Sequence, residues 1–196
     1  IELLRQADDN YWRVYGLGER GISQETVYTH WSYGEFPEDC EVAYGVDFGY
    51  NVPSTVVKIG FKEASCYVSE ALYETKLTTN DLIERLKGLG IERSDELFCD
   101  NAEPKTIEEL CRAGYNAKPA EKDVYAGIQK VKSMPLIVTP ESANLIKEIK
   151  SYKWKLDKNG KIHPDEVPVK FNDHAMDAMR YGIYTKLNRP KFEIIV

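Results

Sequence analysis

Residues 42–53, VAYGVDFGYNVP, decide the fold of this chain. A run rich in Val and Tyr predicts a β-strand, and the Gly, Asn and Pro residues after it predict a tight turn. Asp47 stands where the strand ends. A carboxylate in a buried strand costs several kcal/mol unless it is paired or bound to a cation. Asp47 is therefore either a metal ligand or a cap for the turn, and the other acids of the chain must decide.

The composition is that of one compact domain with a hydrophobic core. The chain has 196 residues, of which 42% are hydrophobic and 30% charged. No apolar run approaches the roughly 20 residues of a membrane span. The first residue is Ile and no signal-peptide pattern follows, so we expect a fragment of a longer protein. The four cysteines are scattered without a CxxC pair, which favours reduced thiols over disulfides or a zinc site.

Charge is distributed unevenly along the chain. The net charge of −6 argues weakly against general nucleic-acid binding. Residues 118–161, however, hold ten lysines and five acids, so this segment is +5 and the remainder is −11. One interpretation is a surface that meets phosphates beside a separate acidic cluster. The alternative is an ordinary solvated helix face.

The order of predicted elements is that of an α/β domain. Three strands at short spacing predict an antiparallel meander, and a helix then leads to a fourth strand that we expect to lie parallel to the first. Two more short strands and four further helices follow. The predicted strands are 41–47, 55–61, 66–73, 96–99, 116–119 and 136–138, with one more possible at 25–31; the predicted helices are 78–89, 104–113, 123–133, 142–152 and 172–187.

Residues 152–163 predict a β-hairpin. Residues 152–156 alternate strictly between apolar and basic side chains, an Asn-Gly turn follows, and residues 161–163 resume the strand. The period of two places Lys153 and Lys155 on one face of the hairpin and Tyr152 and Trp154 on the other.

The acidic residues are predicted to converge. Asp47 ends the first strand and Asp100 the fourth, and neighbouring parallel strands end at the same edge of a sheet. The last helix adds His174 and Asp177, spaced by three, and Asp173, spaced by four from Asp177. Carboxylates from separate elements raise one another's pKa unless a cation compensates them.

Oxygen ligands without thiolate select Mg²⁺ or Mn²⁺, and two such ions about 4 Å apart support phosphodiester hydrolysis. The alternative is purely structural. It has Asp173 as a helix cap, Asp177 paired with Arg180, and turn-capping aspartates at the two strand ends.

Three strings carry a resemblance to a known family. GVDFGY, CDNAEP and NDHAMDAMRYG resemble the C-terminal nuclease domain of phage terminase large subunits, over residues 41–187. The resemblance implies a ribonuclease H-like α/β fold, with a central mixed sheet of five or more strands flanked by helices and an extra β-hairpin near the active site. It also implies that residues 1–40 are a connector from an ATPase domain and residues 41–196 the nuclease domain.

The resemblance further implies a metal-dependent endonuclease that cleaves concatemeric double-stranded viral DNA during genome packaging. Asp47, Asp100 and Asp177 match the three acidic ligands for two Mg²⁺ or Mn²⁺ ions. His174 matches an accessory position near the metals, and either Asp173 or His174 could join Asp177 at the third ligand position. The implied partners are double-stranded DNA, a terminase small subunit and a portal protein, and the implied location is the host cell cytoplasm.

The hairpin resembles one that flanks the family's active site, so Lys153, Lys155 and Lys158 are candidate contacts to DNA phosphates. An edge hairpin protected by lysines is the alternative. A separate expectation concerns the first strand and the turn after it. There we expect Gly45, Gly49 and Asn51 to let a DNA backbone come close to Asp47.

No GxxxxGK[ST] phosphate loop occurs, so we expect no motor activity from this chain. A Holliday-junction resolvase or ribonuclease H of the same fold, and a non-catalytic module that docks on DNA or a portal, remain the alternatives.

Overall fold

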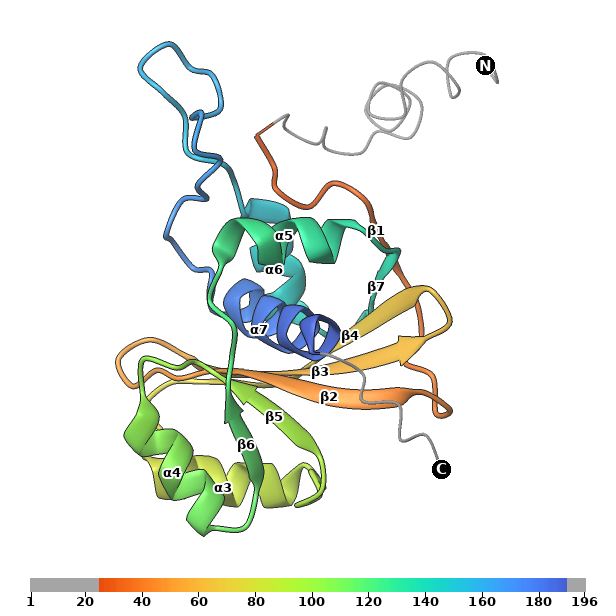
Figure 1. Ribbon diagram of the computed structural model, residues 1–196, viewed down its shortest axis with the longest axis vertical. Coiled ribbons are helices and arrows are strands. Elements are labelled where there is room, and N and C mark those ends of the chain that lie inside the picture. Colours follow the sequence, from red (N-terminus) through yellow and green to blue (C-terminus); the bar gives the residue numbers. More distant parts are fainter. Residues whose placement is uncertain (1–24, 190–196) are drawn as a thin grey trace.

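The computed structural model describes residues 25–189, which form one seven-stranded sheet with helices on both faces (Figure 1). The strand order is β1-β7-β4-β3-β2-β5-β6. β3 runs antiparallel to β2 and β4, and the other neighbours are parallel. The strands are β1 (Trp31–Tyr33), β2 (Glu41–Asp47), β3 (Ser54–Lys62), β4 (Ser65–Glu74), β5 (Glu96–Cys99), β6 (Asn116–Pro119) and β7 (Leu136–Val138).

The helices form two layers. One face of the sheet is covered by α5 (Val124–Lys132), α6 (Ala143–Ser151) and α7 (His174–Asn188), and the other by α3 (Thr79–Gly88) and α4 (Pro104–Arg112) (Figure 1). Each layer has its own core of buried apolar side chains against the sheet. The side chain of Thr78 and that of Asp81 form a capping box at the start of α3, and Pro104 opens α4. The sequence signals for these helix starts are thus met locally.

The predicted fold class is confirmed, with a mixed sheet of seven strands. β2 and β5 are adjacent and parallel, as the sequence predicts. The first strand of the described chain lies at Trp31–Tyr33, later than the predicted 25–31, and pairs with β7. Val27 and Tyr28 are buried in the core. Residues 1–24 of the predicted connector lie outside the described residues, and its link to a preceding domain stays a prediction.

The predicted hairpin segment pairs with itself through antiparallel bridges. Leu156 faces Ile162, and Trp154 faces Pro168, so the pairing extends beyond the predicted end at residue 163. Tyr152 and Trp154 are buried while Lys153 and Lys155 are exposed, which confirms the predicted alternation. The segment projects from the body of the domain and leads back into α7 (Figure 1).

No helix within residues 25–189 is long and apolar enough to cross a membrane.

Candidate metal centre

Register places two aspartates side by side on the sheet. Val46 on β2 is the partner of Cys99 on β5, and the backbone N–H of Asp100 donates to the carbonyl of Val46 at 2.9 Å. The next residues along the two strands are Asp47 and Asp100. Neighbouring strands lie about 4.8 Å apart, so these two side chains start from adjacent positions.

Strand alternation turns both side chains toward α7. Tyr44 and Val46 pack in the core under α3 and α4, so Ala43, Gly45 and Asp47 face the other layer. The same alternation places Phe98 on the α7 face, and Asp100 follows it with the same parity. We call the carboxyl-terminal ends of β2 and β5, together with the start of α7, the acid edge.

Gly45 and Gly182 bring α7 down onto β2. A Cβ atom on Gly45 would lie 1.8 Å from the carbonyl oxygen of Ala178, and one on Gly182 would lie 3.2 Å from Cα of Gly45. The expectation that Gly45 leaves space for a DNA backbone is therefore wrong: α7 fills that space. At Gly49 a Cβ would meet the carbonyl oxygens of residues 52 and 53 at 2.5 Å, so that glycine serves the turn itself.

The first turn of α7 is held by a buried glutamate from α6. Glu148 is 2% exposed, and its Oε2 accepts hydrogen bonds from the backbone N–H groups of Ala175 at 2.7 Å and Met176 at 3.3 Å. Its Oε1 accepts from the Tyr73 hydroxyl at 2.7 Å. Asp173 occupies the N-cap position, but its side chain makes no capping hydrogen bond. The carboxylate that satisfies the helix start thus comes from another helix.

Asp47 pairs with His174 across the acid edge. Oδ2 of Asp47 lies 2.9 Å from Nδ1 of His174. Burial raises the pKa of Asp47 to about 6; the hydrogen bond with His174 opposes that rise, and the charges of Asp177 and Asp100 add to it. The hydrogen bond with Asp47 raises the pKa of His174. The charges of both other predicted ligands therefore affect the pKa of Asp47, and the hydrogen bond with His174 orients its carboxylate.

Asp177 is held between two cations. Its Oδ1 accepts from Nη2 of Arg180 at 2.7 Å, and its Oδ2 from Nζ of Lys170 at 3.1 Å. Lys170 also lies 3.3 Å from Oδ2 of Asp173. The pairing of Asp177 with Arg180, which belongs to the purely structural alternative, is present, and Lys170 adds a second partner.

Asp100 is paired with a lysine from the loop before α5. Its Oδ1 lies 2.5 Å from Nζ of Lys122 and accepts the backbone N–H of Ala102 at 3.0 Å. Tyr181 is buried beside the site, and the charges of all three predicted ligands affect its pKa. Burial raises the pKa of Tyr181, and the charges of Asp177, Asp100 and Asp47 raise it further.

The donor set fits a hard divalent cation in its chemistry. It offers carboxylate oxygens and one imidazole and no thiolate, the ligand types that suit Mg²⁺ and Mn²⁺. Across residues 25–189, however, no three His, Cys, Asp or Glu side chains stand close enough together to hold a metal ion as they are. Asp47, Asp100 and Asp177 instead contact His174 and the cationic side chains described above. Coordination would require some of these contacts to open.

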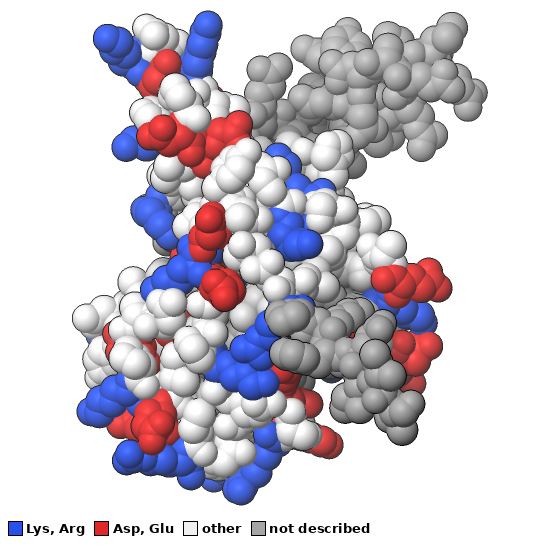
Figure 2. Space-filling view, viewed as in Figure 1, with Lys and Arg blue, Asp and Glu red and all other residues white. Residues whose placement is uncertain are grey.

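The lysines predicted to bind nucleic acid lie on the projecting segment. Lys153 is 3.4 Å from Glu25, and Lys155 and Lys158 are exposed. Figure 2 shows basic side chains at the tip of this segment and mixed charges over the rest of the visible face. Their contact with DNA stays a prediction.

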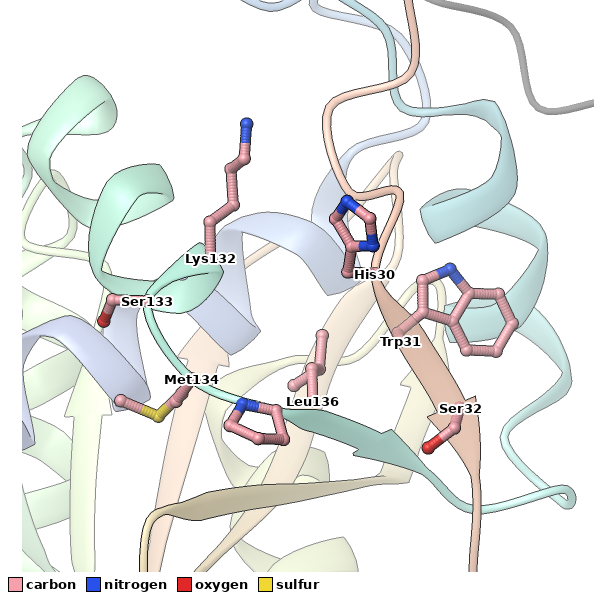
Figure 3. Close-up of a pocket in the computed structure, with 8 residues that line it drawn as sticks. His30, Trp31, Ser32, Lys132, Ser133, Met134 and Leu136 are labelled. Atoms are coloured by element: carbon pink, nitrogen blue, oxygen red, sulfur yellow. The ribbon is translucent and has the colours of Figure 1, made fainter. Parts of the chain in front are cut away.

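A hollow of about 550 Å³ lies beside β1 and β7, at the side of the sheet away from β5 and β6 (Figure 3). It is lined by residues 30–32, which lead into and form β1, and by residues 132–136, which lead into β7. None of the predicted ligands lines it. The acid edge is therefore distinct from this hollow, and two of its aspartates are buried, with Asp47 7% and Asp177 8% exposed.

Sequence reasoning missed three contributors to the site. Glu148 had a signal, because it interrupts the apolar stripe of Leu145, Ile149 and Tyr152 in the helix predicted at 142–152. Lys122 and Lys170 had none, since they lie outside helices and strands and reach their partners only in the folded chain.

Comparisons with known proteins agree on one family. A family model described as "Terminase RNAseH like domain" matches residues 47–184. The chain is 28% identical over 157 residues to the large subunit of the terminase of Escherichia phage T5, covering 76% of this chain and 36% of that protein. It is 25% identical over 201 residues to the PBSX phage terminase large subunit of Bacillus subtilis (strain 168), covering 93% of this chain and 45% of that protein. The chain thus spans less than half the length of these relatives.

Solved structures show the same fold. The nuclease domain of the large terminase g2p from bacteriophage SPP1, with bound Mn, superposes with a TM-score of 0.68 at 20% identity, over 79% of this chain and 94% of that one. The large terminase nuclease from thermophilic phage G20c, with bound magnesium, gives 0.55 at 12% identity, over 83% of this chain and 98% of that one.

Proposed function

The chain belongs to the family of terminase RNase H-like domains, and from that premise we propose that it is a metal-dependent endonuclease. We infer that it cleaves concatemeric double-stranded viral DNA during genome packaging. The relatives are phage terminase large subunits, and two nuclease domains of this fold bind Mn or magnesium. Mg²⁺ or Mn²⁺, as two ions, is the proposed cofactor.

One observation carries the proposal: Asp47 ends β2 and Asp100 follows the adjacent parallel strand β5, and His174 in the first turn of α7 contacts Asp47 at this same end of the sheet. The electrostatic influence of Asp177 and Asp100 on the pKa of Asp47 marks their proximity. Asp47, Asp100 and Asp177 would hold the ions. When bound, Mg²⁺ or Mn²⁺ would supply an activated water and charge stabilisation at the leaving oxygen.

The other residues of the site would position these ligands. His174 orients the carboxylate of Asp47, and Glu148 fixes the helix turn that carries His174 and Asp177. We propose that Lys153, Lys155 and Lys158 contact DNA phosphates without reading bases. A terminase small subunit and a portal protein are the proposed partners in the assembly, and the host cytoplasm is the proposed location.

The test is cleavage of supercoiled plasmid with Mn²⁺, comparing the wild-type chain with Asp100→Ala and with Lys62→Ala. Lys62 pairs with Asp39 at the other end of the strands from Asp47. Its removal therefore changes the net charge of the chain without changing the surroundings of the three predicted ligands. We expect the wild type and Lys62→Ala to nick and linearise plasmid, and Asp100→Ala to lose at least about 100-fold in rate, since even outer partners of a metal contribute about 10- to 100-fold.

Equal cutting by all three proteins would refute the ligand assignment. Absence of cutting by the wild type with any divalent metal would favour the non-catalytic docking module.

A further inference from the structure

The acid edge already holds its own cations. Lys122 contacts Asp100 at 2.5 Å, and Lys170 contacts Asp177 at 3.1 Å and Asp173 at 3.3 Å. These ammonium groups sit on the oxygens that a metal ion would need. A divalent ion and the two lysines therefore compete for the same carboxylates.

Exposure separates the cations that can leave from the one that cannot. The side chain of Arg180 is 2% exposed and packs directly over Gly127, so it is fixed beside Asp177. The side chain of Lys122 is 39% exposed and that of Lys170 is 60% exposed. Their ammonium groups can swing into water at little cost, because exposed lysine side chains keep most of their rotamer freedom.

We propose that Lys122 and Lys170 are displaceable cations that hold the carboxylates of the metal-free site and oppose metal binding. This inference rests on the proposed function and concerns the regulation of the same site. In the metal-free chain the lysines offset the repulsion among the aspartates. A divalent ion supplies that compensation itself, so each lysine is released from its aspartate when the metal enters.

The released lysines also gain a natural partner. Both start beside the carboxylates where a scissile phosphate must lie, so each can transfer its contact from an aspartate to a DNA phosphate oxygen. DNA then removes the competitor from the metal site. Metal binding and DNA binding should therefore strengthen each other, through a thermodynamic coupling that is reciprocal.

The experiment measures Mn²⁺ affinity directly, by the electron paramagnetic resonance signal of free Mn²⁺, with no DNA present. The variants are Lys170→Met, Lys122→Met and the double variant, since Met keeps the apolar stem and removes the charge. Lys62→Met is the matched control, because it removes a lysine–aspartate pair of 2.6 Å at the opposite edge. Asp177→Asn serves as the variant that loses a ligand.

We expect each single variant to bind Mn²⁺ about fivefold more tightly, and the double variant more tightly still, by the usual size of such ion pairs. Lys62→Met should match the wild type and Asp177→Asn should bind more weakly. Thermal melting in EDTA checks that each variant is folded; Lys170 is exposed enough that we expect little loss.

Unchanged or weaker Mn²⁺ affinity in folded Lys170→Met and Lys122→Met would overturn the inference. Absence of Mn²⁺ binding in both the wild type and the lysine variants would also overturn it. The outcome is independent of cleavage. Tighter Mn²⁺ binding in a chain that cuts no DNA would uphold the displaceable lysines and refute the nuclease. Cutting by a chain whose lysine variants bind Mn²⁺ as the wild type does would refute the lysines alone.

Discussion

Carboxylates and cationic side chains lie at both ends of the β2–β5 strand pair, but the pKa of the carboxyl group shifts down at one end and up at the other. At the amino-terminal end, which we call the far edge, Glu96 contacts Lys118 at 2.6 Å, Lys186 at 2.7 Å and Arg189 at 3.4 Å. Burial alone would raise the pKa of Glu96, but the two lysines outweigh burial and lower it to about 2. Cations therefore predominate at the far edge.

At the acid edge Asp100 and Asp177 have cationic partners, but within residues 25–189 the carboxylate of Asp47 pairs only with His174. Burial raises the pKa of Asp47 to about 6 even though His174 contacts it. The difference teaches how to separate a structural carboxylate from a functional one. Glu96 is stabilised by its neighbours in the chain, whereas Asp47 lacks compensation that an external cation could supply.

The largest expected effect comes from Asp47→Asn, which should break the acid edge and leave the far edge intact. We expect DNA cleavage to fall by about 100-fold or more, because a proposed metal ligand is lost. In EDTA, the same change should raise the free energy of unfolding at pH 8 by about 2–3 kcal/mol, because an ionised Asp47 is disfavoured in the fold.

The raised pKa of Asp47 determines how the stability difference between the wild type and Asp47→Asn changes with pH. The pKa of Asp47 is about 6 in the fold and near 3.8 ordinarily, so ionisation favours the unfolded chain. The metal-free wild type should therefore lose stability relative to Asp47→Asn as the pH rises from about 4 through about 6. Urea unfolding at several pH values measures this difference, and a constant difference across that range would contradict the raised pKa.

The acid edge was predictable because its parts follow local patterns. The strands of Asp47 and Asp100 show in the apolar runs before them, and their parallel pairing follows from the helical crossover between them. Strand parity then turns both side chains to one face. His174 and Asp177 share a helix face by their spacing, which the sequence states directly.

What the sequence could not predict depends on contacts between distant segments. That Gly45 meets the backbone of α7 is a property of how closely a helix packs on a strand, and nothing near Gly45 indicates it. The pairing of Lys122 with Asp100 joins loops from different parts of the chain, and many other lysines were equally available. Tertiary packing selects among them.

The second prediction concerns α7, the helix that reaches both edges with Asp177 at one and Lys186 at the other. Gly45→Ala should cost about 3 kcal/mol or more in the free energy of unfolding, because its Cβ would lie 1.8 Å from the Ala178 carbonyl and α7 must move. Gly88→Ala is the matched control, since no atom lies within 4 Å of its Cβ. Equal melting temperatures for the two variants would contradict the close packing of α7 on β2.

The smallest expected effect is that of Glu96→Gln, which should break the far edge alone. Glu96 is partly exposed, so we expect a loss of about 1 kcal/mol at pH 7 after solvent screening, and less in 1 M salt. Because its pKa is lowered in the fold, its contribution is present above about pH 4.5 and is lost as the pH falls toward about 2. Urea unfolding at low and high salt measures the loss, and Mn²⁺ affinity should stay at the wild-type value. A changed Mn²⁺ affinity would mean that the far edge acts on the acid edge through Lys186 and α7, so the two ends of the strand pair would no longer be independent.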